Sequence, residues 1–387
     1  MPPNGGDTPL LFSPIRFRDT VLRNRIVVSP MCQYSAVDGV ANDWHLVHLG
    51  RLALGGAGLV FTEQTAVTPE GRITHGDLGL WSDSQIAPLK RITAFIEDQG
   101  AVPGIQLGHA GRKGSRGLPW HDYQPLRPGD PDGEPWRTVG PTDEPAGDGW
   151  PAPSALSVHE IQEIVIAYGR AAARAAHAGY RAIEVHGAHG YLVHAFLSPI
   201  SNTRSDLYGG DRAGRMRLAL EIAETVRANW PSANPFLYRL SIVDAHGEAG
   251  IKGWNVEDSC VLARELAARG VDAIDCSSGG VAVAARSTMR PPSFGSQVRY
   301  AEAVRRETGI PTVGLGLIRD PHDAEAILRA GNADLIAVAR EMLADPNWAL
   351  HAARALGADP DFALWPRQYG PWLAKREREL TGLTGLK

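Results

Sequence analysis

Short runs of β-branched and other apolar residues recur along this chain, separated by polar and glycine-rich segments. Within each run the apolar positions are continuous rather than alternating, which is typical of strands buried on both faces of a parallel sheet. Eight such runs predict strands at 25–29, 59–65, 102–107, 182–186, 235–242, 273–277, 311–315 and 334–339.

Helical patterns separate most of these runs. Ser157 and Glu160 form a capping box that opens a helix ending at Gly179. Asn255 is placed to cap a helix that runs to Gly270, and Asp320-Pro321 combines a cap with proline at the first helical position. Strand and helix therefore alternate through most of the chain.

This alternation predicts an α/β protein with a (β/α)8 TIM barrel, with a doubly wound open sheet as the competing architecture. No G-x-G-x-x-G follows an early strand, so the open-sheet dinucleotide site is disfavoured. We expect a flexible N-terminus (1–10), a single barrel domain (11–350) and a C-terminal extension (351–387). The aperiodic segment 114–153 predicts a long loop after the third strand, either a pocket wall or lid or a tolerated surface insertion.

Composition and charge limit the function classes. The 387 residues carry a net charge of −4 with no basic cluster, which argues against nucleic acid as a partner. Three scattered cysteines disfavour a disulfide framework, a structural zinc site and a four-cysteine iron–sulfur cluster. No apolar run approaches the length of a membrane helix, and the N-terminus lacks the pattern of a signal peptide, so a cytoplasmic protein is expected.

Polar residues fall at nearly every predicted strand end, where function concentrates in a barrel. The last two strand ends suit a phosphate group, because glycine exposes backbone N–H groups and arginine binds phosphate through two hydrogen bonds. The residues at these ends are Gly314, Gly316, Ala339 and Arg340. The alternative is that the glycines only form a turn and Arg340 is a solvated cap.

His186 and His189 stand three residues apart after the fourth strand, with Tyr191 two residues further on. No Asp, Glu or Cys accompanies the histidines in a ligand pattern, so no metal is expected. Two neutral imidazoles suit the stabilisation of a negatively charged oxygen, and Tyr191 suits a general acid. The alternative for either histidine is a core position.

Arg239 ends the fifth strand, where a buried guanidinium needs an anion or an electron-rich ring as partner. A flavin that accepts electrons develops negative charge near N1, and Gln106, with donor and acceptor, suits its pyrimidine edge. Cys32 is either a small buried hydrophobe or a thiol that tunes such a ring.

At this point the motifs resemble a known family. SPMCQY (29–34), GIQLGHAGRK (104–113), HGAHGYLVHAFLSPISNTRSDLYGG (186–210) and Arg239 are similar to the old yellow enzyme family of FMN-dependent ene-reductases, over about residues 11–348. The resemblance implies FMN reduced by NADPH or NADH, and hydride transfer to the activated C=C bond of an α,β-unsaturated carbonyl or nitro compound. Cys32 resembles the thermophilic-like subclass, and the family implies a homodimer or homotetramer.

The resemblance also implies residue roles. His186 and His189 would hold the substrate's oxygen, Tyr191 would protonate its α-carbon, and Tyr34 would line the substrate pocket. The cofactor-binding set would comprise Ser29, Pro30, Met31, Cys32, Gln64, Gln106, Arg239, Gly316, Ala339 and Arg340.

Three positions depart from the family pattern. Gln64 stands where the family usually has alanine or glycine, and Ala339 replaces the usual glycine before the phosphate arginine. Gly370-Pro371 follows Tyr369 where subclass members often carry an arginine that reaches the neighbouring subunit, and Trp372 is a candidate substitute, as in xenobiotic reductases.

Other functions compete with this one. A 2,4-dienoyl-CoA reductase is disfavoured because the chain lacks a cysteine cluster and further nucleotide-binding domains. A flavin-free, phosphate-binding barrel lyase with a Schiff-base lysine is disfavoured because no lysine falls at a predicted strand end. A flavin oxidoreductase of another substrate class and a non-enzymatic flavin-binding protein stay open.

Overall fold

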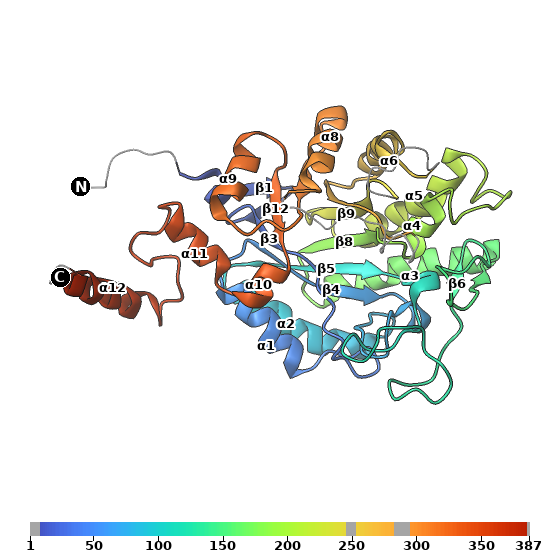
Figure 1. The fold of residues 1–387 in the computed structure, drawn as a ribbon, viewed down its shortest axis with the longest axis horizontal. Coiled ribbons are helices and arrows are strands. Elements are labelled where there is room, and N and C mark those ends of the chain that lie inside the picture. The colour runs from blue at the N-terminus through green and yellow to red at the C-terminus, as the bar shows by residue number, and fades with distance from the viewer. Residues whose placement is uncertain (1–7, 245–252, 282–294, 385–387) are drawn as a thin grey trace.

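The computed structural model describes residues 8–244, 253–281 and 295–384. Eight parallel strands close into a barrel in chain order, with β12 pairing back to β3 (Figure 1). All eight predicted strands are present, and the predicted barrel is confirmed. They are β3 (Ile26–Val28), β4 (Leu59–Ala66), β5 (Val102–Gly108), β8 (Ala182–Gly187), β9 (Phe236–Ser241), β10 (Ala273–Ser277), β11 (Thr312–Gly314) and β12 (Leu335–Val338).

Helices surround this barrel and bury one face against it (Figure 1). In chain order the helices are α1 (Asp43–Leu54), α2 (Ile86–Asp98), α3 (Val158–His177), α4 (Leu192–Leu197), α5 (Arg212–Asn229), α6 (Val256–Ala268), α8 (Val298–Thr308), α9 (Pro321–Arg329), α10 (Arg340–Ala344), α11 (Trp348–Ala355) and α12 (Gly370–Thr384). Short 3₁₀ turns are η1 (Leu10–Phe12), η2 (Pro69–Gly71), η3 (Asp83–Gln85) and η4 (Gly111–Lys113).

The predicted caps begin the helices as expected. Ser157 Oγ accepts from the Glu160 N–H at 3.2 Å, while Glu160 accepts from the Ser157 N–H at 2.8 Å. Asn255 caps α6, and the Asp320 carboxylate caps α9. Each cap satisfies N–H groups that a helix start leaves without an internal partner.

The barrel interior is divided into an apolar and a polar zone. Near the N-terminal ends of the strands, inward side chains form a buried apolar cluster that includes Phe61, Leu237 and Leu335. A hairpin of β1 (Ile15–Phe17) and β2 (Thr20–Leu22) adds Phe17 and Leu22 to that cluster. Inward positions further along the strands are polar, so the apolar cluster closes the N-terminal end of the barrel and the polar side chains lie toward its C-terminal end.

The long loop after β5 is present as predicted. Within 114–153 the strand β6 (Val139–Gly140) pairs with β7 (Ser154–Ala155), and the rest lies at the end toward which the barrel strand β5 points (Figure 1). The loop therefore stands where a barrel places its functional groups.

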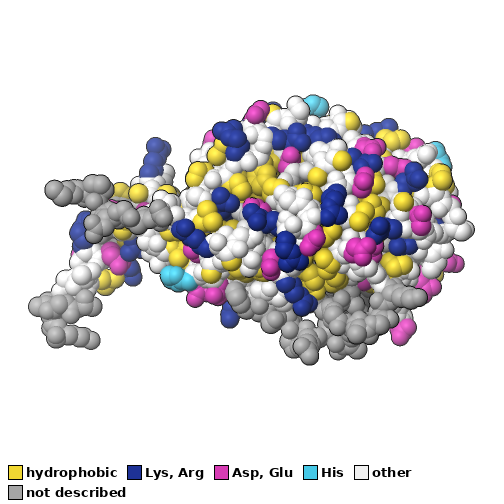
Figure 2. All heavy atoms as spheres, turned by 90° about the horizontal axis from the view of Figure 1, so that it is seen from above, with side chains coloured by type: hydrophobic (Ala, Val, Ile, Leu, Met, Phe, Trp, Pro, Cys, Tyr) yellow, Lys and Arg dark blue, Asp and Glu magenta, His cyan; other side chains and the backbone are white. Residues whose placement is uncertain are grey.

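The C-terminal segment leaves the barrel. Helix α11 spans the predicted boundary between barrel and extension at residues 350 and 351. Its residues Trp348 and Ala352 pack into the core. Helix α12 stands apart from the barrel (Figure 1), and Trp372 on it is 69% exposed. On the face seen in Figure 2, acidic and basic side chains are interspersed. Among the described residues, no helix is long and apolar enough to cross a membrane.

Candidate active site

A row of inward-facing polar side chains follows the apolar cluster on five adjacent strands. Gln64, Gln106 and Glu184 stand opposite one another on β4, β5 and β8, and Arg239 stands opposite Asp275 on β9 and β10. Gln106 Nε2 donates to Glu184 Oε1 at 2.7 Å, and Arg239 Nε lies 3.5 Å from Asp275 Oδ1. All five are buried. The predicted Gln106 and Arg239 thus lie in one polar row, with two carboxyl groups that sequence reasoning missed.

Burial dominates the electrostatics of this row. It raises the pKa of Glu184, with a further contribution from Asp275, while Arg239 opposes the rise. Burial also raises the pKa of Asp275, again against Arg239. One guanidinium therefore faces two carboxyl groups that have lost their water, and the position of Arg239 limits how far both pKa values rise.

Several polar atoms of this row have no hydrogen-bond partner among the described residues. These atoms are both amide atoms of Gln64, Oε2 of Glu184, and Nε of Arg239 with Oδ1 of Asp275, which face each other only as an ion pair at 3.5 Å. Buried polar groups in proteins are nearly always hydrogen-bonded, and leaving one unpaired costs about 1–3 kcal/mol. The row is therefore built to meet a polar partner that the chain does not itself supply.

His186 and His189 form a hydrogen-bonded pair at the end of β8. His186 Nδ1 accepts from the Ala188 N–H at 3.1 Å, so His186 carries its proton on Nε2, which lies 3.2 Å from His189 Nδ1. His189 Nε2 then faces Ser277 Oγ at 2.7 Å. Burial, followed by the charge of Arg239, holds the pKa of both imidazoles well below its ordinary value. Both rings are therefore neutral, and each carries one N–H.

Tyr191 packs its ring at 79° to that of His186, with centroids 5.0 Å apart. Burial raises the pKa of the phenol well above its ordinary value, with smaller contributions from Tyr123 and Cys32. The Lys113 ammonium lies over the Tyr191 ring at 5.4 Å and donates to the His189 carbonyl at 2.7 Å. Tyr191 therefore keeps its proton at neutral pH, which the general-acid role requires.

The long loop supplies an aromatic wall to the site. Tyr34 Oη lies 3.2 Å from Tyr123 Oη, and the Trp120 ring meets the Tyr34 ring edge-on with centroids 6.2 Å apart. The Arg116 guanidinium covers Tyr123 at 3.5 Å. The loop is thus a wall beside Tyr34, which favours the pocket-wall interpretation over a tolerated insertion.

Three residues of this region have a strained backbone. Tyr34, Tyr123 and His189 have φ angles of 53°, 57° and 60°, in the left-handed region that residues with a Cβ rarely adopt. Such conformations cost on the order of 1–3 kcal/mol each and cluster at functional sites. The surrounding contacts hold these three side chains in orientations that the backbone alone disfavours.

The segment after β3 runs between β12 and β4. The Ser29 N–H donates to the Val338 carbonyl at 3.0 Å, and the Gln33 N–H donates to Glu63 Oε2 at 3.0 Å. Pro30, Met31 and Cys32 between them are half-buried. Burial raises the pKa of the Cys32 thiol well above its ordinary value, so it is protonated at neutral pH.

The predicted phosphate residues lie on neighbouring strands. Gly316 follows β11 with φ of 120°, and a Cβ there would lie 3.2 Å from the backbone nitrogen of Gln297. Ala339 and Arg340 begin α10 directly after β12. The Arg340 side chain is exposed. The two strand ends meet, and their binding of phosphate stays a prediction.

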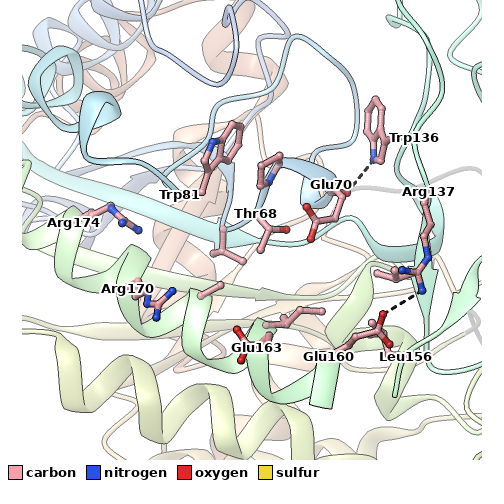
Figure 3. Close-up of a pocket in the computed structure, with 15 residues that line it drawn as sticks. Thr68, Glu70, Trp81, Trp136, Arg137, Leu156, Glu160, Glu163, Arg170 and Arg174 are labelled. Carbon is pink, nitrogen blue, oxygen red and sulfur yellow. Dashed lines mark hydrogen bonds and ion pairs between the residues drawn. The ribbon is translucent and has the colours of Figure 1, made fainter. Parts of the chain in front are cut away.

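A cavity of 610 Å³ lies on the flank of the barrel, between α3 and the segment after β4 (Figure 3). Trp81, Trp136, Arg170 and Arg174 line it, and the Arg137–Glu160 ion pair closes one side. None of the predicted site residues contributes to its wall, so the candidate chemistry lies elsewhere. Among the described residues, no group of three His, Cys, Asp or Glu side chains is arranged to hold a metal ion.

Sequence reasoning missed five residues of this site: Lys113, Tyr123, Glu184, Asp275 and Ser277. Glu184 and Asp275 sit inside apolar strands two residues after Ala182 and Ala273 of the inner cluster, a spacing that marks them as inward-facing. Lys113 lies beyond a strand end, and the turn η4 brings it back to the site. Nothing local in the sequence indicates that Tyr123 meets Tyr34.

Comparisons with known proteins agree with this architecture. Residues 10–358 match the model of the NADH:flavin oxidoreductase / NADH oxidase family. The chain is 41% identical over 350 residues to an NADPH dehydrogenase of Geobacillus sp. (strain WCH70), covering 90% of this chain and 95% of that protein. It is 42% identical over 363 residues to an NADPH dehydrogenase of Listeria innocua serovar 6a, covering 93% and 98%.

Solved structures give the same picture. Morphinone reductase superposes with a TM-score of 0.72 at 25% identity, covering 90% of each chain. Another structure of that enzyme, in complex with tetrahydroNAD, superposes with the same TM-score.

Proposed function

Since this chain belongs to the NADH:flavin oxidoreductase / NADH oxidase family, we propose that it is an ene-reductase that reduces the activated C=C bond of α,β-unsaturated carbonyl or nitro compounds. The coarser activity is that of a flavin-dependent NAD(P)H oxidoreductase, with FMN as cofactor and NADPH as reductant. The substrate class and the residue roles are the proposal.

The polar row suits FMN. A flavin carries donors and acceptors along its pyrimidine edge, and the row offers buried atoms without a hydrogen bond in Gln64 and Glu184, beside the guanidinium of Arg239. Arg239 and Gln106 would hold that edge, the segment Ser29–Cys32 would contact the ring, and Gly316 with Ala339–Arg340 would hold the phosphate. When bound, FMN takes a hydride from NADPH and passes it to the β-carbon of the alkene.

The histidine pair supports the choice of substrate class. The Nε2–H of His186 donates to His189 Nδ1, and the Nε2–H of His189 donates to Ser277 Oγ. A carbonyl or nitro oxygen in their place would accept these bonds and gain from them as it becomes negative. Because both rings are neutral, this is stabilisation by N–H dipoles rather than by proton transfer.

Tyr191 completes the reaction. Its phenol lies beside His186 and keeps its proton, so it would protonate the α-carbon as the β-carbon receives the hydride. Tyr34 and the loop residue Tyr123 would line the substrate pocket. The observation that carries the proposal is this arrangement of two neutral imidazoles and a protonated phenol next to unpartnered buried polar atoms.

The test replaces both histidines. In His186→Ala with His189→Ala, we expect kcat/KM for cyclohexenone to fall by at least about 10²-fold, the usual loss for one donor to a developing oxyanion. FMN content should stay that of the wild type. His159→Ala, an exposed histidine on α3, is the matched control. Unchanged turnover in the double variant would remove the proposed role, and a protein that reduces no activated alkene would leave only the coarser activity.

We also propose that α12 docks on a second copy of this chain, as homodimer or homotetramer. Trp372 on α12 and Tyr369 directly before it are 69% and 52% exposed, and neighbouring exposed apolar side chains often mark a protein–protein interaction site. Light scattering should show a smaller assembly for Trp372→Ala than for Leu207→Ala, an exposed apolar residue away from α12. Equal assemblies would contradict the docking.

A further inference from the structure

Gln64 occupies its position through an irregularity in β4. Thr62 stands opposite Ile105 and Gln64 stands opposite Gln106, so the intervening Glu63 has no partner on β5. Glu63 instead accepts from the Gln33 N–H and lies 3.5 Å from His45. Such a bulge re-aims side chains, and here it turns Glu63 out of the row and Gln64 into it.

The Gln64 side chain is held against the neighbouring strand. A Cβ on Gly108 would lie 2.6 Å from Gln64 Cγ, so only glycine at position 108 leaves room for it. The residue is 2% exposed, and its amide oxygen and nitrogen both lack a partner among the described residues. A glutamine kept in this state costs free energy twice, through lost side-chain entropy and through two unpaired polar atoms. A partner at the mouth of the barrel has to offset that cost.

We propose that the Gln64 carboxamide donates a hydrogen bond to the flavin ring and thereby favours the reduced over the oxidised cofactor. The inference rests on the proposed function, because it takes FMN as the ligand of the polar row. A hydrogen bond becomes stronger when its acceptor is charged, and its strength is then roughly twice that of a bond between neutral groups. Reduction places negative charge on the ring, so a hydrogen bond donated by Gln64 would be stronger to the reduced cofactor than to the oxidised one.

This role differs from that of Arg239. A guanidinium with an ion-pair partner fixes a charge in the site, whereas a neutral amide adds a hydrogen bond without adding charge. Gln64 is therefore a positioning residue that tunes the cofactor. Its removal should change the reduction potential of FMN more than the affinity for oxidised FMN.

The test compares Gln64→Met, which keeps the length but removes the polar atoms, with the wild-type holoprotein. We measure the dissociation constant of oxidised FMN and the reduction potential by dye equilibration. We expect reduced FMN to bind about tenfold more weakly relative to oxidised FMN, which lowers the two-electron potential by about 30 mV.

Two controls make the result specific. Thr62→Val removes a polar atom from the same strand, where Thr62 Oγ1 meets Tyr180 Oη at 2.9 Å, and should leave the potential unchanged. Gln64→Ala gives the same comparison with a smaller side chain if the methionine variant does not fold.

The outcomes separate this inference from the proposed function. An unchanged or raised potential in Gln64→Met, with FMN still bound, would overturn the donor role of Gln64 and leave the enzyme assignment intact. An equal shift in Thr62→Val would also overturn it, because the effect would then follow from strand stability. A wild-type protein that binds no FMN would instead refute the proposed function.

Discussion

Replacing Arg239 by methionine tests the electrostatic account of the polar row. The substitution keeps most of the side-chain volume but removes the cation that faces Asp275 at 3.5 Å and limits the pKa of Glu184. Asp275 and Glu184 are 1% and 0% exposed, so neither recovers water in the variant. Breaking a buried ion pair from one side costs about 3–5 kcal/mol, and we expect a loss of stability of this size at pH 8.

The loss depends on pH with a definite sign. Without Arg239, burial raises the pKa of Asp275 further above its unfolded value of about 3.9. The folded variant then binds more protons than the unfolded chain between those two pKa values, so its stability falls as pH rises through that window. Glu184 adds little, because its raised pKa already favours the protonated form. The difference from the wild type should therefore shrink on acidification, by up to about 1.4 kcal/mol per pH unit.

The assay is urea unfolding of the flavin-free proteins at pH 5.5 and pH 8, followed by tryptophan fluorescence. Flavin-free protein is used because a bound ligand adds its own stabilisation. Arg239→Lys, which keeps the charge, should show a smaller and nearly pH-independent loss. The reasoning would be refuted if Arg239→Met lost as much unfolding free energy at pH 5.5 as at pH 8, or more, relative to the wild type.

Further predictions concern the catalytic end of the barrel and one helix cap. Tyr191→Phe should slow reoxidation of the reduced enzyme by cyclohexenone by about 10²–10⁴-fold in stopped-flow measurements and leave reduction by NADPH unchanged, since a general acid acts only in the second step; equal slowing of both steps would contradict this. The lowered pKa values of His186 and His189 mean that the unfolded chain binds more protons below about pH 6.5, so wild-type stability should fall on acidification there. In the double variant His186→Asn with His189→Asn, the free energy of unfolding from urea titrations at pH 7.5, 6 and 5 should fall less on acidification than in the wild type. An equal fall in both proteins would count against this. Ser157→Ala should cost about 1 kcal/mol of unfolding free energy through loss of the α3 cap, and a loss near zero would show that the cap is dispensable.

The strands and caps were predictable because they depend on local signals. A run buried on both faces, such as Leu335–Val338, is apolar whatever its neighbours are, and Ser157 with Glu160 encodes a helix start within four residues. The closure of eight parallel strands then follows from their number and order. The barrel architecture was therefore accessible without coordinates.

The site was predictable only in part, because its remaining contacts depend on register and on the path of a loop. The bulge that turns Gln64 inward and Glu63 aside depends on pairing with β5, so the sequence of β4 alone does not indicate it. The pairing of Arg239 with Asp275 requires the register of β9 against β10. Tyr123 reaches Tyr34 from a segment without periodicity, so no pattern in the sequence indicates the contact.

The central claim is that the polar row holds a flavin that passes electrons from NADPH to an activated alkene. The most direct measurement is the visible spectrum of the purified protein under anaerobic conditions, first with NADPH and then with cyclohexenone or maleimide. The account predicts a yellow protein that NADPH bleaches and the alkene restores. A colourless protein that FMN does not reconstitute, or a bleached protein that no activated alkene reoxidises, would contradict it.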